Sequence, residues 1–182
     1  VNGNAKNPLK QIGKSKETGT KITFTPSSEI FSSTKFSSAI IQKRMRELAF
    51  LNKGIRLVVV DKTIKKEKSY EFKYDGGLIE FVEFLNQKKE KLKNKNGNNL
   101  FKKPIYIEGS KNNIEIQCSL EWNSNYSEDV YAYTNNIYQK DGGTHLLGFR
   151  SALTRVVNKY VSDNNILKKN KLSISGEDIK AV

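Results

Sequence analysis

The sequence has one cysteine, one histidine, one tryptophan and one methionine in 182 residues. The single cysteine, Cys118, excludes an internal disulfide framework and a metal site built from several cysteines. A reducing compartment is therefore the natural home of the chain. His145 is the only histidine, and a metal site through a lone histidine is disfavoured because such sites combine several ligands.

Long apolar runs are absent as well. The longest is Leu57-Val58-Val59-Val60, far short of the roughly 20 residues that a membrane-spanning helix needs. No charged segment followed by an apolar one opens the chain. We expect a soluble protein with no visible targeting signal and no membrane partner.

Acidic residues and arginines are both scarce. The 19 acidic residues face 32 basic ones, which gives a net charge of +13 and favours polyanions such as nucleic acid. However, 27 of the basic residues are lysines and only five are arginines, and asparagine is plentiful. Coding bias of an AT-rich genome explains that pattern as well as a dedicated binding face does. The hydrophobic fraction of 36% is enough for one domain or two small ones.

Periodicity predicts a strand and then a helix near the start. The segment 21–25 alternates and is followed by Pro26, which indicates a strand with one buried face. Ser37 or Ser38 can cap the helix that follows, and Gly54 ends it. The apolar stripe of this helix comprises Ile40, Ile41, Met45, Leu48 and Ala49.

The middle of the chain predicts two strands, a second helix and a loop. Segment 55–61 is typical of a largely buried strand, and segment 69–74 of a strand whose aromatic residues share a face. A helix follows Asp75-Gly76-Gly77, and this glycine pair is the expected domain boundary. The lysine- and asparagine-rich segment 86–99 is expected to be mobile.

The last third contains the clearest strand pattern. Residues 114–122 alternate strictly, which places Cys118 in the core as an inert hydrophobe. A further strand is predicted over 129–137, and Thr144 can cap a helix over 145–161. The inner face of that helix comprises Phe149, Leu153, Val156, Val157 and Tyr160.

Few residues offer chemistry. Gly142-Gly143-Thr144 opens a helix and could hold an anion, but no Lys-Ser or Lys-Thr follows, so a structural turn is favoured. His145 is expected to pack or cap, since no paired nucleophile is recognisable. Arg150 and Arg155 point about 140° apart on a regular helix, so they cannot both be buried against one core face. One of them can face a phosphate backbone, and the alternative is that it forms an ion pair at the surface. The lysines of 88–95 are either phosphate contacts or a solvated loop.

Four runs, found in the family's order along almost the whole chain, resemble the B subunit of bacterial DNA gyrase. They are Gly19-Thr20-Lys21-Ile22-Thr23-Phe24-Thr25-Pro26 with Ile30-Phe31; Arg46 to Gly54; Asn135-Asn136-Ile137 with Asp141 to Arg150, Ala152 to Arg155 and Asn158; and Gly176-Glu177-Asp178. The equivalent subunit of topoisomerase IV is the near relative. The run from Arg46 to Gly54, together with Leu146, Phe149 and Arg150, favours gyrase.

The resemblance implies an α+β and α/β fold in two parts. Residues 1–76 would be the C-terminal part of a GHKL-type ATPase sandwich. Residues 77–182 would be a ribosomal-protein-S5-domain-2-like transducer domain with a left-handed βαβ crossover, incomplete at its C-terminus. The implied function is a type II DNA topoisomerase, which couples ATP binding and dimerisation to DNA strand passage and negative supercoiling. The alternatives are a topoisomerase IV subunit and a non-enzymatic basic nucleic-acid-binding module.

The resemblance also implies sites and partners. Gly19 and Thr20 match the adenine end of the nucleotide pocket, where aminocoumarins also bind, and Arg150 matches an arginine lining the DNA cavity between two transducers. ATP and Mg²⁺ would be cofactors of the longer protein, and the gyrase A subunit, double-stranded DNA and a second copy its partners. Its compartment would be the bacterial cytoplasm or a bacterial-type plastid such as an apicoplast.

The departures from the family pattern limit what this chain does by itself. The family's catalytic glutamate and magnesium-holding asparagine lie upstream of the matched runs, and its Gln-Thr-Lys loop lies downstream. We therefore expect no catalytic residue, no metal ligand and no ATP hydrolysis in this chain alone. Tyr138 and the segment 179–182 also depart from the pattern.

Overall fold

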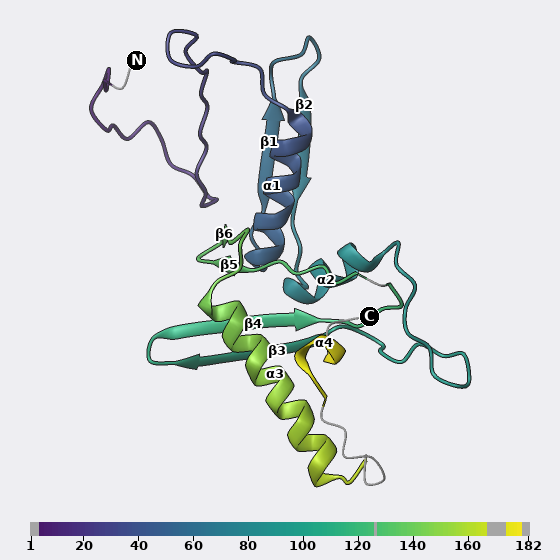
Figure 1. Cartoon of the computed structure of the whole chain (residues 1–182). Helices are drawn as coiled ribbons and strands as arrows, with labels where there is room; N and C mark the ends of the chain where they lie inside the picture. The colour runs from purple at the N-terminus through teal and green to yellow at the C-terminus, as the bar shows by residue number, and fades with distance from the viewer. Residues whose placement is uncertain (1–3, 126, 167–173, 180–182) are drawn as a thin grey trace. The chain divides into compact units, whose positions relative to one another are not determined.

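The computed structural model describes residues 4–125, 127–166 and 174–179, and its chain divides into two compact units, 1–36 and 37–182 (Figure 1). The predicted departure at 180–182 lies outside the described residues. Strands and helices both occur in the second unit, so the predicted mixed α and β fold class is confirmed.

The first unit contains no helix or strand among residues 4–36. The amides of Ile30 and Phe31 donate to the Ser27 carbonyl and form a turn, and the rings of Phe24 and Phe36 meet edge to face at 5.5 Å. The predicted strand over 21–25 is therefore wrong. Alternation gives a strand a face to bury, but a strand also needs a pairing neighbour, and the described residues supply none.

The second unit begins with helix α1 (Ser38–Leu51). Ser37 is its N-cap, because its hydroxyl accepts from the Ile40 amide at 3.5 Å, which confirms one of the two predicted caps. Ala49 and Phe50 are buried, while Ile40 is 71% exposed although it was expected on the inner face. Burial is therefore concentrated in the C-terminal half of α1.

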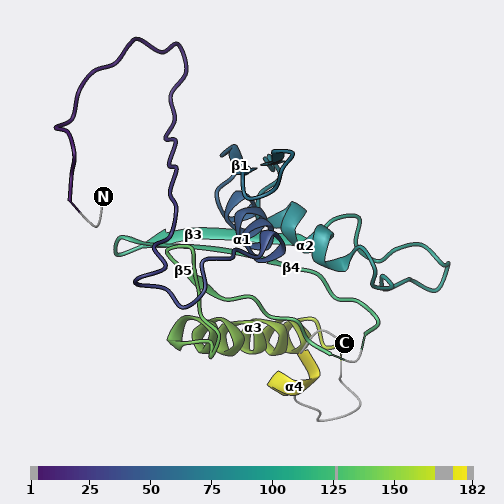
Figure 2. The same cartoon turned by 90° about the horizontal axis from the view of Figure 1, so that it is seen from above.

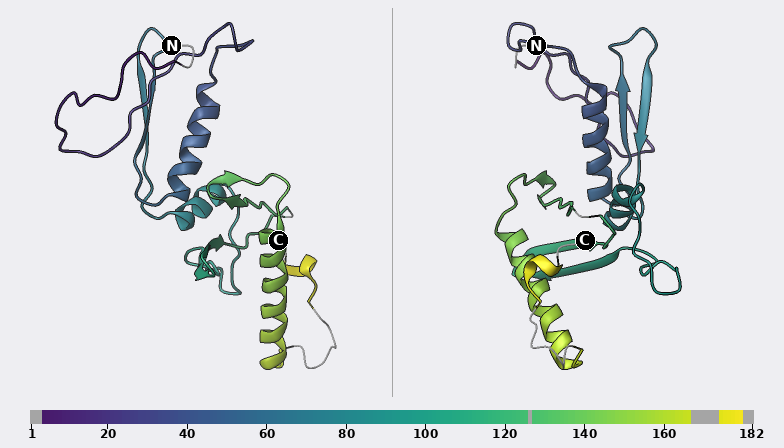
Figure 3. Two further views of the ribbon diagram at one scale, coloured as in Figure 1. Left: turned by 90° about the vertical axis from the view of Figure 1, so that its left-hand side faces the viewer. Right: turned by 45° about the vertical axis from the view of Figure 1, so that its right-hand side comes forward.

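An antiparallel hairpin of β1 (Leu57–Asp61) and β2 (Lys68–Phe72) packs beside α1, as both views of Figure 3 show. The shared aromatic face of β2 is confirmed, since Tyr70 and Phe72 are the covered residues of that strand. Val58 and Val60 are 46% and 43% exposed, so the prediction of a largely buried strand is wrong. One face of the hairpin packs against α1, and the opposite face stays partly exposed among the described residues.

Helix α2 (Leu78–Asn86) completes an aromatic core with α1 and β2. The Phe50 ring stacks on Tyr74 with 3.7 Å between centroids and on Phe81 with 4.9 Å, and Phe84 lies 5.5 Å away. Gly77 precedes α2 with a φ of 60°, a conformation that favours glycine. This core spans the predicted boundary at Gly76-Gly77, so 37–182 forms one compact unit.

The segment 86–99 makes specific contacts with other described residues, and its mobility stays a prediction. Bridges pair Lys91 with Asn123 and Lys93 with Asn99. Lys91 also forms a 3.0 Å ion pair with the buried carboxylate of Glu121, which accepts a hydrogen bond from Asn86 as well. Polar partners contact this segment, and a composition count misses those that lie elsewhere in the chain, such as Glu121 and Asn123.

The clearest predicted strand is confirmed as β4 (Ile114–Leu120), which pairs with β3 (Ile105–Lys111) in an antiparallel hairpin, seen edge-on in Figure 2. Asn112 and Asn113 join them with φ values of 53° and 62°, as a type I′ turn requires. The start of β4 is not in the core, since Ile114 is 64% exposed. Cys118 is partly buried, and burial raises the pKa of its thiol, which supports the prediction of an inert side chain.

The predicted strand over 129–137 is wrong. Two short strands, β5 (Tyr133–Thr134) and β6 (Ile137–Tyr138), form a hairpin instead. The turn residues Asn135 and Asn136 have φ values of 48° and 66°. Asparagine tolerates this left-handed conformation, so the pair was an overlooked turn signal.

Helices α3 (Thr144–Asp163) and α4 (Gly176–Ile179) end the described chain. Gly143 occupies the N-cap position and Thr144 is already helical, so the predicted Thr144 cap is wrong. Val156 and Tyr160 are both 62% exposed and do not lie on a buried face. The three two-stranded sheets are all antiparallel among the described residues, and the left-handed crossover stays a prediction.

Candidate functional site

The turn before α3 is built from two glycines. Gly142 has a φ of 74°, and its amide donates to the Gln139 carbonyl at 3.0 Å. Gly143 has a φ of 156°, and a Cβ there would lie 2.9 Å from His145 Nδ1. Both positions therefore favour glycine for structural reasons. This geometry supports the turn interpretation, and the exposed His145 packs beside the turn.

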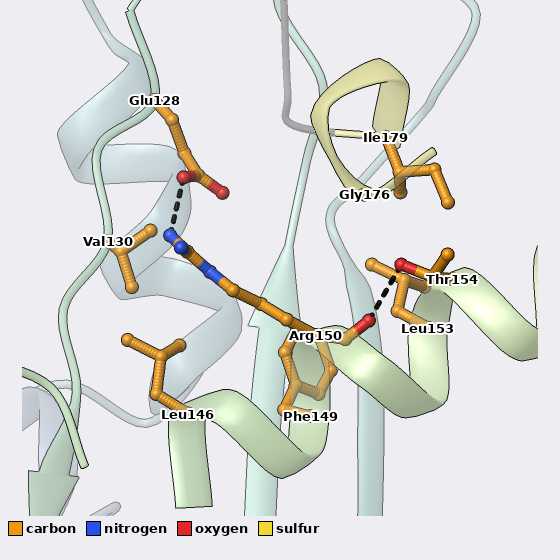
Figure 4. A pocket seen from close by; sticks show the side chains of 9 residues that line it. All are labelled: Glu128, Val130, Leu146, Phe149, Arg150, Leu153, Thr154, Gly176 and Ile179. Atoms are coloured by element: carbon orange, nitrogen blue, oxygen red, sulfur yellow. Dashed lines mark hydrogen bonds and ion pairs between the residues drawn. The ribbon is translucent and has the colours of Figure 1, made fainter. Parts of the chain in front are cut away.

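Arg150 lies on the second turn of α3 and points toward Glu128, as Figure 4 shows. Its Nη2 is 2.6 Å from a Glu128 carboxylate oxygen, in an ion pair whose side chains are 43% and 26% exposed. The surface ion pair was one of the two predicted alternatives for an arginine on this helix. Arg155 is also exposed.

The Arg150–Glu128 pair borders a small hollow that is open to solvent. The remaining lining comes from α3, α4 and the chain beside them (Figure 4): Val130, Leu146, Phe149, Leu153, Thr154, Gly176 and Ile179. Among these described residues, Arg150 is the only cation. The arrangement suits the binding of an anion that displaces Glu128, and its lining offers no general base, since the carboxylate is held by the guanidinium.

Gly19 and Thr20 lie in the first unit, outside regular structure, and both are exposed. A Cβ added at Gly19 would meet no atom within 4 Å. Neither residue lines the hollow beside Arg150. Gly19 and Thr20 belong to a different unit from Arg150, and their role stays a prediction.

A contact between α1 and the β5–β6 hairpin was missed in the sequence. Arg44 Nη2 donates to the Asn136 carbonyl at 2.7 Å, and Asn136 Nδ2 donates to Asn52 Oδ1 at 3.1 Å. Both bonds are partly buried. The signal available was the Asn135-Asn136 pair within a family-like run, but nothing local connects it to Arg44 or Asn52.

Metal and membrane features are absent from the described part of the chain. Those residues contain no group of three or more His, Cys, Asp or Glu side chains close enough to hold an ion. Within the same residues, every helix is too short or too polar to span a bilayer.

Comparison with known proteins gives consistent matches. The family model for DNA gyrase B matches residues 77–182. The DNA gyrase B subunit of Chlamydia muridarum is 46% identical over 176 residues, which are 94% of this chain and 21% of that protein. The corresponding protein of Clostridium acetobutylicum is 44% identical over 179 residues, 98% of this chain and 26% of that protein. The chain thus spans about a quarter or less of these relatives.

Two solved structures share the fold. The 43K ATPase domain of Thermus thermophilus gyrase B, in complex with an aminocoumarin, is 30% identical with a TM-score of 0.68, over 85% of this chain and 40% of that one. The B subunit of Myxococcus xanthus DNA gyrase is 21% identical with a TM-score of 0.63, over 75% and 36% of the two chains. At that identity the second similarity concerns the fold alone.

Proposed function

The chain belongs to the DNA gyrase B family, and we propose that it is the part of such a protein that connects the nucleotide site to the DNA. In this proposal, ATP binding and dimerisation of two B subunits drive DNA strand passage and negative supercoiling. The observation that carries the proposal is the 46% identity to a gyrase B subunit over 94% of the chain. Topoisomerase activity belongs to the longer protein.

The two proposed parts meet at Gly76-Gly77. Residues 1–76 correspond to the end of a GHKL-type ATPase domain and residues 77–182 to a transducer domain. The family match begins at residue 77, which supports this division. In the proposal, the core around Phe50 joins α1, Tyr74 and α2 into one stiff element across Gly76-Gly77.

ATP and Mg²⁺ are the proposed cofactors, with Gly19 and Thr20 at the adenine end of the pocket. The hydroxyl of Thr20 would hydrogen-bond within the adenine-recognition network. The Thermus thermophilus relative, whose structure contains an aminocoumarin, supports a nucleotide site that such inhibitors share. The rest of the pocket and all magnesium ligands would come from other parts of the longer protein, so this chain alone is expected to be inactive.

The proposed partners are a gyrase A subunit, double-stranded DNA and a second B subunit, in a bacterial cytoplasm or a bacterial-type plastid. Arg150 would face the DNA from the cavity between two transducers. Its guanidinium is nearly half exposed, so a phosphate can reach it.

The proposal is tested by Arg150→Gln in the complete protein, assembled with gyrase A. ATP-dependent supercoiling is expected to fall much more than nucleotide affinity, because Arg150 contacts DNA and not nucleotide. Arg155→Gln removes an exposed charge from the same helix and is the matched control. Equal loss of supercoiling and nucleotide affinity in Arg150→Gln would count against this role.

The two alternatives are less well supported. The relatives named above are DNA gyrase B proteins, which favours gyrase over topoisomerase IV. A basic binding module would need free lysines, yet Lys89, Lys91 and Lys93 of the lysine-rich segment are paired with carboxylates of Asp129, Glu121 and Glu90. These pairs reduce the charge available to phosphates.

A further inference from the structure

Two hydrogen bonds join parts of the second unit that are 92 and 84 residues apart in the sequence. Through them, Arg44 and Asn52 of the α1 region hold Asn136, which lies at the tip of the β5–β6 hairpin. We propose that Arg44, Asn52 and Asn136 form a polar junction that transmits movement of α1 to α3. This inference rests on the proposed function, because it names residues that would relay nucleotide binding toward DNA.

Arg44 and Asn52 each make a second contact within the α1 region, and this contact orients the side chain toward Asn136. Arg44 Nη1 lies 3.3 Å from the Glu47 carboxylate, one turn along the helix, and this carboxylate orients the guanidinium. Asn52 Nδ2 donates to the Leu48 carbonyl at 2.8 Å, which leaves Asn52 Oδ1 free to accept from Asn136. Both side chains are therefore held by other residues of α1, so they are expected to move together with this helix.

The hairpin side is equally constrained. Asn135 and Asn136 hold left-handed backbone angles, and the Gln139 amide donates to the Ala132 carbonyl at 2.8 Å directly beyond the two strands. The Gly142 amide then donates to the Gln139 carbonyl at 3.0 Å. Consecutive hydrogen-bonded turns thus connect Asn136 to the start of α3, which carries Arg150 on its second turn. The connection over residues 139–143 is short and closed by these hydrogen bonds, so in the proposal a displacement of Asn136 reaches the start of α3.

Asn136 is a positioning residue, because it acts through α3 and contacts neither nucleotide nor DNA. The chain offers a matched control at the other Asn-Asn turn. Asn112 and Asn113 adopt nearly the same φ values, 53° and 62° against 48° and 66°, but their side chains form no hydrogen bond with any residue that the structure describes. Glycine adopts this conformation without strain, so Asn136→Gly and Asn113→Gly both keep the turn, and only the first removes a side-chain hydrogen bond to the α1 region.

The experiment uses the complete protein assembled with gyrase A. The number of ATP molecules hydrolysed per supercoil introduced and the dissociation constant of a non-hydrolysable ATP analogue are measured for each variant. Asn136→Gly is expected to raise the number of ATP molecules hydrolysed per supercoil by roughly 2- to 30-fold, the factor to which typical coupling energies of such networks correspond. Nucleotide affinity is expected to stay unchanged. Asn113→Gly is expected to match the unaltered protein in both.

The inference is overturned if Asn136→Gly and Asn113→Gly give the same ratio, or if nucleotide affinity falls by as large a factor as the hydrolysis ratio rises. If Asn136→Gly does not fold, Arg44→Met and Arg44→Lys decide the question from the helix side. Arg44→Met is expected to raise the ratio and Arg44→Lys, which retains a donor, to restore part of it; equal ratios for these two overturn the inference. Absence of supercoiling in the unaltered assembly would instead contradict the proposed function.

Discussion

The Arg150–Glu128 pair decides how much positive charge the hollow presents to an anion. A carboxylate 2.6 Å from the guanidinium neutralises it while the pair is intact, although half-exposed pairs of this kind are worth only about 0–1 kcal/mol. A phosphate can therefore displace Glu128 at small cost. In the proposal, Glu128 would therefore compete only weakly with a DNA phosphate for Arg150.

Glu128→Gln in the complete protein is expected to increase DNA affinity and to steepen its dependence on salt by about one phosphate contact, a slope change of roughly 0.9 in log–log form. Removing the carboxylate frees Arg150 for a phosphate in every molecule. Glu83→Gln is the control, because Glu83 is exposed on α2 and its removal changes net charge equally. Identical salt slopes for the two variants would show that Arg150 does not meet DNA.

Among the helices and strands, α1 is held by its buried C-terminal half. Phe50 is 1% exposed and its ring contacts Tyr74, Phe81 and Phe84, so it joins α1 to the segment after β2 and to α2. Ile40, about three turns earlier on the same helix, is 71% exposed. The two residues are similar in hydrophobicity but differ in what they contact.

Phe50→Ala is expected to lower the free energy of unfolding by about 3–5 kcal/mol, the usual cost of deleting a buried aromatic ring. Ile40→Ala is expected to change it by less than about 0.5 kcal/mol, as surface substitutions do. Urea unfolding followed by circular dichroism measures both. Similar losses in the two variants would contradict the packing described for α1.

The elements that were predicted well from the sequence are those whose pattern is local. The cap at Ser37 and the strand β4 depend on neighbours within a few residues, and both are present, although the burial of β4 does not alternate along the strand. The strand predicted over 21–25 failed because its pairing partner is not a local property. The β5–β6 hairpin was missed because Asn135-Asn136 was not recognised as a turn.

For the molecule as a whole, the order of four family-like runs predicted the family, and the match over residues 77–182 confirmed it. Composition by itself indicated only a basic globular chain. The junction of Arg44, Asn52 and Asn136 could not be predicted, because polar contacts across 84 to 92 residues leave no periodic signal. The roles of Gly19, Thr20 and Arg150 rest on the resemblance alone.

We propose above all that this chain links ATP to DNA topology within a gyrase. The decisive experiment incubates the complete protein and its A-type partner with relaxed circular DNA, with and without ATP, and resolves the topoisomers on a gel. Negatively supercoiled circles are expected only when ATP and both proteins are present. Retained DNA binding with no change in linking number, or ATP-dependent relaxation and decatenation without supercoiling, would refute this role.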